Sequence, residues 1–210
     1  WLTVRGAKLH ISAAALVHEL VVMPTKSMRE AEADYAVSFS CPANAPGVKI
    51  INRSFAPAKL NEFDYPASAH HSMPEGFVIF DDVFVPWERV FLAGEHRMAG
   101  VFARSLGLWE RTLGLLEAAE RAEQIIGLAL LVSEQQGKGG TPTVENAVAE
   151  LVCYAQIIRM SLDWSCRNFE RTASGMIHPN VLGVNAGKYY YAANYHQMIQ
   201  KLHDLGGGLV

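Results

Sequence analysis

Three side chains in the first part of this 210-residue sequence have the chemistry of proton-transfer groups: His10, His18 and Glu75. An imidazole titrates near neutrality, so a histidine can accept or donate a proton under physiological conditions. A glutamate can act as an acid or a base when it is buried beside a substrate. Each has a structural alternative, because a histidine can be satisfied within a sheet and a glutamate can be solvated ahead of a strand. These residues indicate acid–base chemistry without naming a reaction.

Residues with metal-binding or redox chemistry are poorly grouped in the sequence. His70 and His71 are adjacent, so their side chains point in different directions on most backbones, and no third ligand accompanies them. Cys41, Cys153 and Cys166 are odd in number and far apart, which predicts neither a metal-ligand pair nor a disulfide framework. We therefore expect no metal site from these residues and a reducing cytoplasm as the location.

Composition excludes several classes of protein. A hydrophobic content of 50% is enough for one large or two small domains with a real core. The formal net charge of -3 gives no electrostatic case for binding nucleic acid or an anionic membrane. No apolar run reaches the length of a transmembrane helix, and no signal peptide is visible.

Residues 1–95 are predicted to form short strands. Five runs of β-forming residues are separated by Pro, Gly and Asn, which is typical of an antiparallel sheet or a small barrel. The last run, "VIFDDVFVPWERVF", should end as a strand at Pro86, because proline cannot donate to a sheet ladder. Asp81 and Asp82 interrupt its apolar residues, so we expect a bulge or a turn at which their side chains bind backbone amides.

Residues 96–210 are predicted to form long antiparallel helices. A first helix follows residue 96, a second begins at Pro142 and ends near Gly175, and a third runs from beyond Pro179 to the glycines at 206–208. Strands followed by helices indicate an α+β fold with two domains, 1–95 and 96–210. Tyr191 and Tyr195 share a helix face, which favours a packed helix interface over substrate stacking.

Four stretches resemble the 4-hydroxyphenylacetate 3-hydroxylase family, which includes the 4-hydroxybutyryl-CoA dehydratases and shares the acyl-CoA dehydrogenase fold. They are "GAKLHISAAALVHELVVMP", "DYAVSFSCPANAPGVKIINR", "FDDVFVPWERVF" and "HDLGGGLV". The resemblance implies a central β domain followed by a truncated C-terminal helical bundle domain, with the N-terminal helical domain absent. Because the sequence opens on Trp1 and closes on an apolar pair after three glycines, we expect an internal fragment.

The dehydratase branch of the family is tested by its iron–sulfur ligands. The resemblance places Glu110 and Glu117 where dehydratases carry a histidine and a cysteine, Ala118 where they carry a lysine, and Gly114 where they carry a tyrosine. Lone carboxylates are poor replacements for thiolate at an iron–sulfur site. Glu75, in contrast, falls where dehydratases have an active-site glutamate. The resemblance therefore argues against an iron–sulfur cluster while keeping Glu75 as a catalytic candidate.

The resemblance also assigns cofactor-binding candidates. Ser12 matches a small hydroxyl facing the flavin, with capping of its own turn as the alternative. His10 is shared with the dehydratases, and His18 with both branches. Arg111 could reach a cofactor phosphate or a subunit interface, or form a surface ion pair. Gly206, Gly207 and Gly208 could allow the backbone to approach the cofactor, or simply end the last helix.

The family implies a flavin-dependent oxidoreductase. Our first hypothesis is a monooxygenase that takes reduced FAD from a partner flavin reductase and hydroxylates a phenol, with His18 and Glu75 as catalytic residues and His10, Ser12, Arg111, Gly206 and Gly207 as cofactor-binding residues. The alternatives are an acyl-CoA dehydratase or isomerase with a modified or lost iron–sulfur site, and a flavin-binding subunit without catalysis. The resemblance also implies a homo-oligomer, a dimer or a tetramer.

Overall fold

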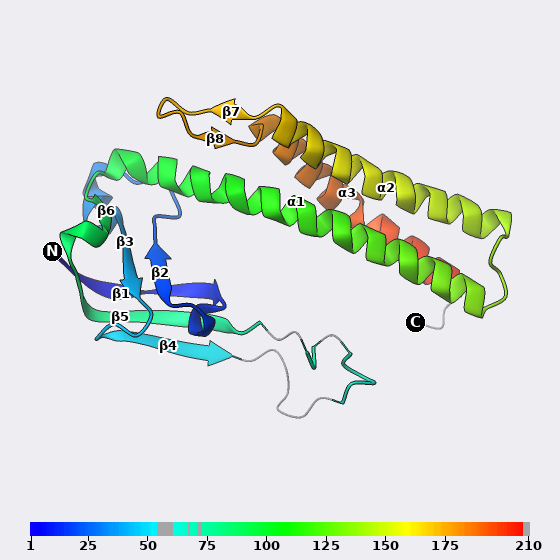
Figure 1. The fold of residues 1–210 in the computed structure, drawn as a ribbon, viewed down its shortest axis with the longest axis horizontal. Coiled ribbons are helices and arrows are strands. Elements are labelled where there is room, and N and C mark those ends of the chain that lie inside the picture. The colour runs from blue at the N-terminus through cyan, green and yellow to red at the C-terminus, as the bar shows by residue number, and fades with distance from the viewer. Residues whose placement is uncertain (54–60, 67, 71–72, 208–210) are drawn as a thin grey trace. The chain divides into compact units, whose positions relative to one another are not determined.

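The computed structural model describes residues 1–53, 61–66, 68–70 and 73–207. They fold into two compact units, Trp1–Arg104 and Ser105–Val210. Strands dominate the first unit and helices the second (Figure 1), which confirms the predicted α+β class. That the units are the family's central β domain and helical bundle domain stays a prediction.

The first unit contains two three-stranded antiparallel sheets. One has the order β1-β5-β4, formed by Leu2–Ser12, Glu75–Val85 and Val48–Arg53. The other has the order β2-β3-β6, formed by Glu19–Val22, Val37–Pro42 and Val90–Ala93. Short 3-10 helices η1 (Ala14–Leu16), η2 (Glu30–Tyr35) and η3 (Trp87–Arg89) connect the strands. The five runs predicted as strands correspond to β1 to β5, whereas β6 and the 3-10 helices were not predicted.

Apolar side chains of both sheets form the core of the first unit. Phe39 of β3 and Phe80 of β5 meet edge to face with ring centroids 5.6 Å apart. They belong to a buried cluster that takes residues from β2, β3, β5 and η1: Ala14, Leu20, Phe39, Cys41, Val78, Phe80, Val83 and Val85. Burial also raises the pKa of the Cys41 thiol.

A bulge at Asp81 and Asp82 explains the two aspartates in the middle of β5. Val78 and Phe80 are buried before it and Val83 and Val85 after it, so the buried positions change from even to odd numbers. At this point the register with β1 shifts, between Val4 and Gly6 of that strand. Asp82 also has a left-handed φ of 54°. The extra residue keeps both halves of the strand facing the core.

The aspartate side chains do not bind backbone amides, so that prediction is wrong. The carboxylate of Asp82 accepts two hydrogen bonds from Arg5 of β1, at 3.0 and 2.5 Å. Asp81 forms an ion pair with Lys49 of β4 at 2.8 Å, and this pair lowers the pKa of its carboxyl. Cations on the neighbouring strands take the place of amides, since the bulge points both carboxylates away from the core. The predicted end of the strand at Pro86 is confirmed.

The helices are α1 (His96–Gln135), α2 (Pro142–Arg167) and α3 (Val181–Gly206). The first turns of α1 belong to the first unit and the rest to the second. α2 ends at Arg167 rather than near Gly175, because the chain turns back in a hairpin of β7 (Glu170–Arg171) and β8 (Ile177–His178). Within the described residues, no helix is long and apolar enough to cross a bilayer.

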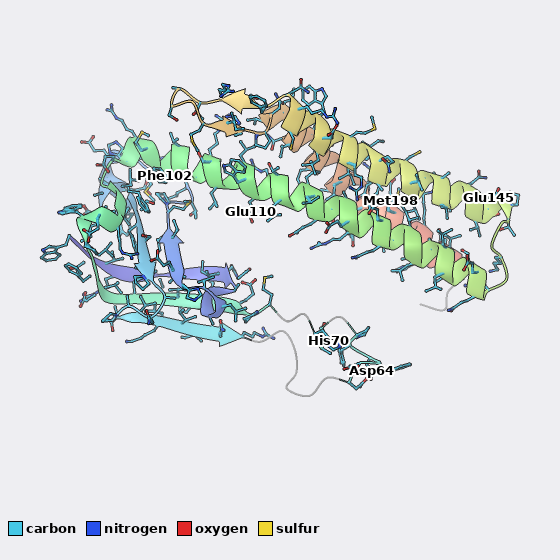
Figure 2. All side chains as sticks on the ribbon, in the orientation of Figure 1. Asp64, His70, Phe102, Glu110, Glu145 and Met198 are labelled. Atoms are coloured by element: carbon cyan, nitrogen blue, oxygen red, sulfur yellow. The ribbon has the colours of Figure 1, made fainter. Side chains whose placement is uncertain are left out.

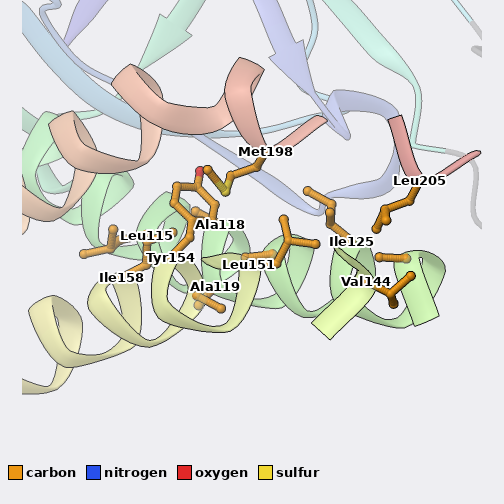
Figure 3. Close-up of a cluster of buried hydrophobic side chains, with 13 residues drawn as sticks. Leu115, Ala118, Ala119, Ile125, Val144, Leu151, Tyr154, Ile158, Met198 and Leu205 are labelled. Atoms are coloured by element: carbon orange, nitrogen blue, oxygen red, sulfur yellow. The ribbon is translucent and has the colours of Figure 1, made fainter. Parts of the chain in front are cut away.

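The core of the second unit lies among its three helices (Figure 3). Tyr154 is buried at its centre and donates a hydrogen bond to the carbonyl oxygen of Tyr191 at 2.9 Å. Tyr191 and Tyr195 pack against this core with ring centroids 5.4 Å apart, which confirms the predicted helix interface. Two glycines of α3, Gly183 and Gly187, allow close packing, because a Cβ on either would lie within 3 Å of α2 side-chain atoms.

Candidate functional site

The predicted residues Ser12 and Glu75 meet at one end of the β1-β5-β4 sheet. They are direct partners in the antiparallel register, although 63 residues separate them in sequence. The hydroxyl of Ser12 donates a hydrogen bond to Oε1 of Glu75. On the other side of β5, Arg53 is the register partner of Glu75. The register therefore places a carboxylate between a hydroxyl and a guanidinium-bearing residue.

The second carboxylate oxygen of Glu75 has no hydrogen-bond partner in the part of the chain that the structure describes, although it is buried. A buried acceptor without a partner costs about 1–3 kcal/mol. In native proteins such an acceptor is usually satisfied by a bound ligand or a water molecule. The Glu75 Oε2 atom is therefore where this sheet end can accept a proton or an N–H or O–H donor from a bound molecule.

The backbone on both sides of Ser12 is held in an unfavourable conformation. His10 has φ 62° and Ala13 has φ 60°, in the left-handed region that non-glycine residues rarely adopt. Each such residue costs about 1–3 kcal/mol and tends to occur at functional sites. His10 lies at a register shift between Leu9 and Ile11, and a bulge of this kind re-aims side chains.

Close packing around Gly76 fixes the turn after Ser12. A Cβ on Gly76 would lie 2.7 Å from the Cβ of Ala14 and 3.1 Å from the carbonyl oxygen of Ile11. The amide of Ala13 also donates to the carbonyl of Pro74 at 2.8 Å. Only glycine fits here, and the tight contact holds η1 against the start of β5 beside Glu75.

His18 lies just before β2 in the other sheet. Its carbonyl oxygen accepts a hydrogen bond from the amide of Ala43 at 2.9 Å, and the residue is exposed. The structure gives no contact between its imidazole and either Ser12 or Glu75. Its predicted catalytic role stays a prediction.

Three cofactor candidates belong to the second unit. Arg111 is exposed on α1, with its guanidinium 3.7 Å from the position of a Cβ on Gly107. Gly206 ends α3, and Gly207 is its C-cap with φ 66°. The side-chain amide of Gln136 donates to the carbonyl of Gly206 at 3.1 Å. The helix-ending role of these glycines is observed, and their approach to a cofactor stays a prediction; Gly208 lies outside the described residues.

His70 is the described member of the histidine pair, and its imidazole faces one carboxylate. His70 Nε2 lies 3.5 Å from Glu62 Oε1 in the segment before β5 (Figure 2), and His71 is not among the described residues. Across the described ranges, no group of three or more His, Cys, Asp or Glu side chains could hold a metal ion.

A cavity of about 700 Å³ in the first unit lies apart from these candidates. None of the predicted site residues lines it, and four of its five charged side chains have partners among the described residues, the exception being the exposed Asp34. Arg5 binds Asp82, Lys26 binds Glu32, and Lys8 donates to the carbonyl of Met23 at 3.3 Å. We place the site at the Ser12–Glu75 pair, where a buried polar atom has no partner among the described residues, rather than at this cavity.

Two family models together cover the chain almost from end to end. The N-terminal model of 4-hydroxyphenylacetate 3-hydroxylase matches residues 2–92, and the C-terminal model matches residues 99–210. The chain belongs to the 4-hydroxyphenylacetate 3-hydroxylase family. The family membership predicted from sequence motifs is confirmed.

Relatives in this family include both kinds of enzyme. A 2,4,6-trichlorophenol monooxygenase of Cupriavidus pinatubonensis is 31% identical over 174 residues, which cover 83% of this chain and 34% of the relative. The 4-hydroxybutyryl-CoA dehydratase/vinylacetyl-CoA-Delta-isomerase of Clostridium aminobutyricum is 29% identical over 215 residues, covering 100% of this chain and 44% of the relative. The chain thus spans less than half the length of these curated relatives.

Solved structures confirm the fold. The oxygenase component of 4-hydroxyphenylacetate 3-monooxygenase matches with a TM-score of 0.85 and 25% identity over 97% of this chain and 44% of that one. It has also been solved with bound FAD. A 4-hydroxybutyryl-CoA dehydratase from N. maritimus matches with a TM-score of 0.89 and 22% identity over 99% of this chain and 42% of that one. The acyl-CoA dehydrogenase-like fold predicted for the family is confirmed.

Arg53 and Gly76 were missed as site residues in the sequence. Arg53 becomes a neighbour of Glu75 only through the β4-β5 register, which no motif reveals. Gly76 carries a usable signal, since a glycine at the start of a strand often marks a close backbone approach.

Proposed function

We propose that the protein containing this chain is a reduced-FAD-dependent monooxygenase that hydroxylates a phenol. The observation that carries the site assignment is the Ser12–Glu75 pair, whose buried Oε2 atom has no partner in the described part of the chain. The reaction class is supported by a phenol monooxygenase among the relatives and by the carboxylates Glu110 and Glu117, at positions where the resemblance places the cluster ligands of a dehydratase. A flavin reductase would be the partner that supplies reduced FAD.

The donor and acceptor pattern of the pair fits a flavin. Ser12 has a single hydroxyl proton and gives it to Glu75, so its oxygen can offer only lone pairs to a ligand. The edge of a reduced isoalloxazine carries N–H donors, which such an acceptor can bind. When bound, the flavin supplies the oxygen activation that no protein side chain provides. We assign Ser12 and the bulged His10 to binding its ring, and Arg111, Gly206 and Gly207 to the rest of the cofactor.

Glu75 is then left to act on the substrate. With Oε1 held by Ser12, the lone pairs of Oε2 can accept the proton of a phenolic hydroxyl. Removing this proton raises the electron density of the ring, which favours attack by an electrophilic oxygen. We assign His18 as the second proton-transfer residue. The fixed hydroxyl contact gives the carboxylate one orientation, so the acceptor atom is already in position before the phenol binds.

Flavin and iron content test this proposal first. The full-length protein would be purified without oxygen and assayed for FAD, iron and acid-labile sulfide. FAD without iron supports the monooxygenase, and oxygen-dependent hydroxylation of phenols with a reductase would then be measured. About four irons per subunit would indicate a cluster of the kind that cysteine-rich sites hold and would overturn it.

Variants of the pair separate the two roles. Ser12→Ala removes the acceptor and should weaken reduced-FAD binding about 5- to 10-fold, the effect of losing one hydrogen bond of about 1 kcal/mol. Glu75→Gln should retain FAD affinity and lower the rate of hydroxylation, because an amide oxygen is a far weaker base. Glu19→Gln is a matched control, because Glu19 forms a 2.9 Å ion pair with Arg89 and contacts neither Ser12 nor Glu75. If all three variants lost FAD affinity and hydroxylation rate to the same extent, the assignment would be contradicted.

An acyl-CoA dehydratase is the second candidate. It is favoured by the dehydratase relative that aligns over the whole chain and by Glu75, which stands where the resemblance places a dehydratase glutamate. Conversion of a 4-hydroxyacyl-CoA by the iron-containing protein, without a reductase, would establish it.

A further inference from the structure

Lys188 of α3 differs from the other described lysines in having no oxygen partner. Its side chain is half-buried, and the described residues offer its ammonium group neither an ion pair nor a hydrogen bond. The ammonium lies 5.3 Å from the ring centroid of Tyr191, a cation–π contact. Every other described lysine donates to a carboxylate, an amide or a carbonyl oxygen: Lys8, Lys26, Lys49, Lys138 and Lys201.

A glycine of α1 makes room for this ammonium group. A Cβ on Gly114 would lie 3.2 Å from Lys188 Nζ, so the cation rests against the helix where a side chain would otherwise stand. Gly107 is seven residues earlier on the same face, and the guanidinium of Arg111 lies near it. At 1.5 Å of rise per residue, the two glycines are about 10 Å apart along the helix. Two cations thus lie over one face of α1.

The acidic residues of this face limit what the cations can bind. Glu110 (Figure 2) and Glu117 lie four residues before and three residues after Gly114, so both are its neighbours on the helix surface. Oε2 of Glu117 lies 3.8 Å from Nη2 of Arg121, and neither Glu110 nor Glu117 forms an ion pair with Lys188. The flanking negative charges disfavour a phosphate group with two or more charges. A ligand group with a single negative charge is repelled less by these carboxylates than such a phosphate.

We propose that Lys188, seated on Gly114, binds a singly charged oxygen anion, a phenolate or a carboxylate, of a small-molecule ligand. A half-buried ammonium without an acceptor is stabilised by such an oxygen, and a charge-assisted hydrogen bond contributes about 1.5–3 kcal/mol. The phenolate form of the ligand rests on the proposed function, whereas the carboxylate form does not.

Direct binding to the full-length protein tests this site. The probes are two pairs of similar shape: 4-nitrophenol, which ionises near neutrality, against phenol, and benzoate against benzamide. Lys188→Met keeps the length of the side chain and removes the charge. It should weaken binding of 4-nitrophenolate and benzoate about 10- to 100-fold and leave the neutral partners within about twofold. Lys188→Arg should restore most of the affinity.

Lys201→Met is the matched control. Lys201 is also a lysine of α3, but its ammonium pairs with Glu150 at 2.8 Å. This variant should bind all four probes like the wild type. If Lys188→Met binds both anions as the wild type does, or loses the neutral probes to the same extent, the site is refuted. Wild-type protein that binds neither anion refutes it as well.

The two anions separate this inference from the proposed function. Lys188-dependent binding of 4-nitrophenolate supports both. Lys188-dependent binding of benzoate without any binding of phenols leaves the anion site standing and overturns the phenol as substrate.

Discussion

Replacing Gly187 with alanine should destabilise the second unit by overpacking the contact between α3 and its neighbours. The new Cβ would lie 2.7 Å from the Cβ of Ser161 on α2 and 2.9 Å from Cδ2 of Leu115 on α1. Carbon atoms at rest are about 3.5–4.0 Å apart, so these neighbours would have to move by about 1 Å. Extra methyl groups in a packed core cost about 1–3 kcal/mol.

Gly127 of α1 provides a matched control for the helix propensity of alanine. Its added Cβ would meet nothing within 4 Å. Gly127→Ala should therefore stabilise the helix by about 1 kcal/mol, the usual gain of alanine over glycine. Gly187→Ala receives the same gain together with the packing cost, so the difference between the two variants isolates packing. We expect this difference to be about 1–3 kcal/mol.

Urea unfolding followed by circular dichroism would measure the difference in the free energy of unfolding. A Gly187→Ala protein as stable as Gly127→Ala would refute the close packing of α3. A double variant gives a second check, because Leu115→Ala removes both Leu115 methyl carbons that the new Cβ would meet, at 2.9 and 3.2 Å. Gly187→Ala should then cost less in the Leu115→Ala background than alone, a coupling expected only for residues in contact.

Three further predictions concern single contacts. Tyr154→Phe removes the hydrogen bond to Tyr191 and should cost about 1 kcal/mol at neutral pH. Burial raises the pKa of Tyr154, so the folded state keeps a proton that the unfolded chain releases, and the free energy of unfolding should fall as the pH rises above about 10. In urea unfolding, the Phe variant should therefore lose less stability than the wild type between about pH 9 and pH 11. Asn180→Ala removes the N-cap of α3, where the side chain accepts from the amide of Gly183 at 3.0 Å, and should lower the free energy of unfolding by about 1 kcal/mol, whereas Asn180→Asp should keep it. Asp82→Ala should destabilise more than Asp82→Asn in thermal unfolding, by about 1 kcal/mol, because asparagine tolerates the left-handed φ; equal effects would show that the bulge relaxes.

Much of the fold could be predicted because its signals are local. β5 ends before Pro86 because proline has no amide hydrogen to donate to the sheet. Pro142 and Pro179 lie within two residues of the observed starts of α2 and α3. The end of α2 could not be predicted, since "CRNFERTAS" has no strong helix breaker before Gly175. The hairpin there is set by backbone pairing, with the amide of Thr172 donating to the carbonyl of Met176 at 2.8 Å.

The candidate site was only partly accessible from sequence. Ser12 and Glu75 could each be nominated through the family resemblance, but their contact depends on the β1-β5 register. That register includes two shifts, and a shift by one residue would move a side chain to the opposite face of the sheet. Lys188 carries no motif at all, because its significance comes from the missing side chain of Gly114 on another helix.

The pairing of Ser12 with Glu75 also has a consequence for the order of folding. A contact that closes a loop of 63 residues forms slowly, because the ends must meet before the contact can stabilise them. α2 and α3, in contrast, are joined by a short hairpin and can associate early. In pulse-labelled refolding, the amides of these helices should be protected from hydrogen exchange before those of β1. The candidate site would then be assembled last, and substitutions at the β1-β5 contact would slow its maturation while leaving the helices formed.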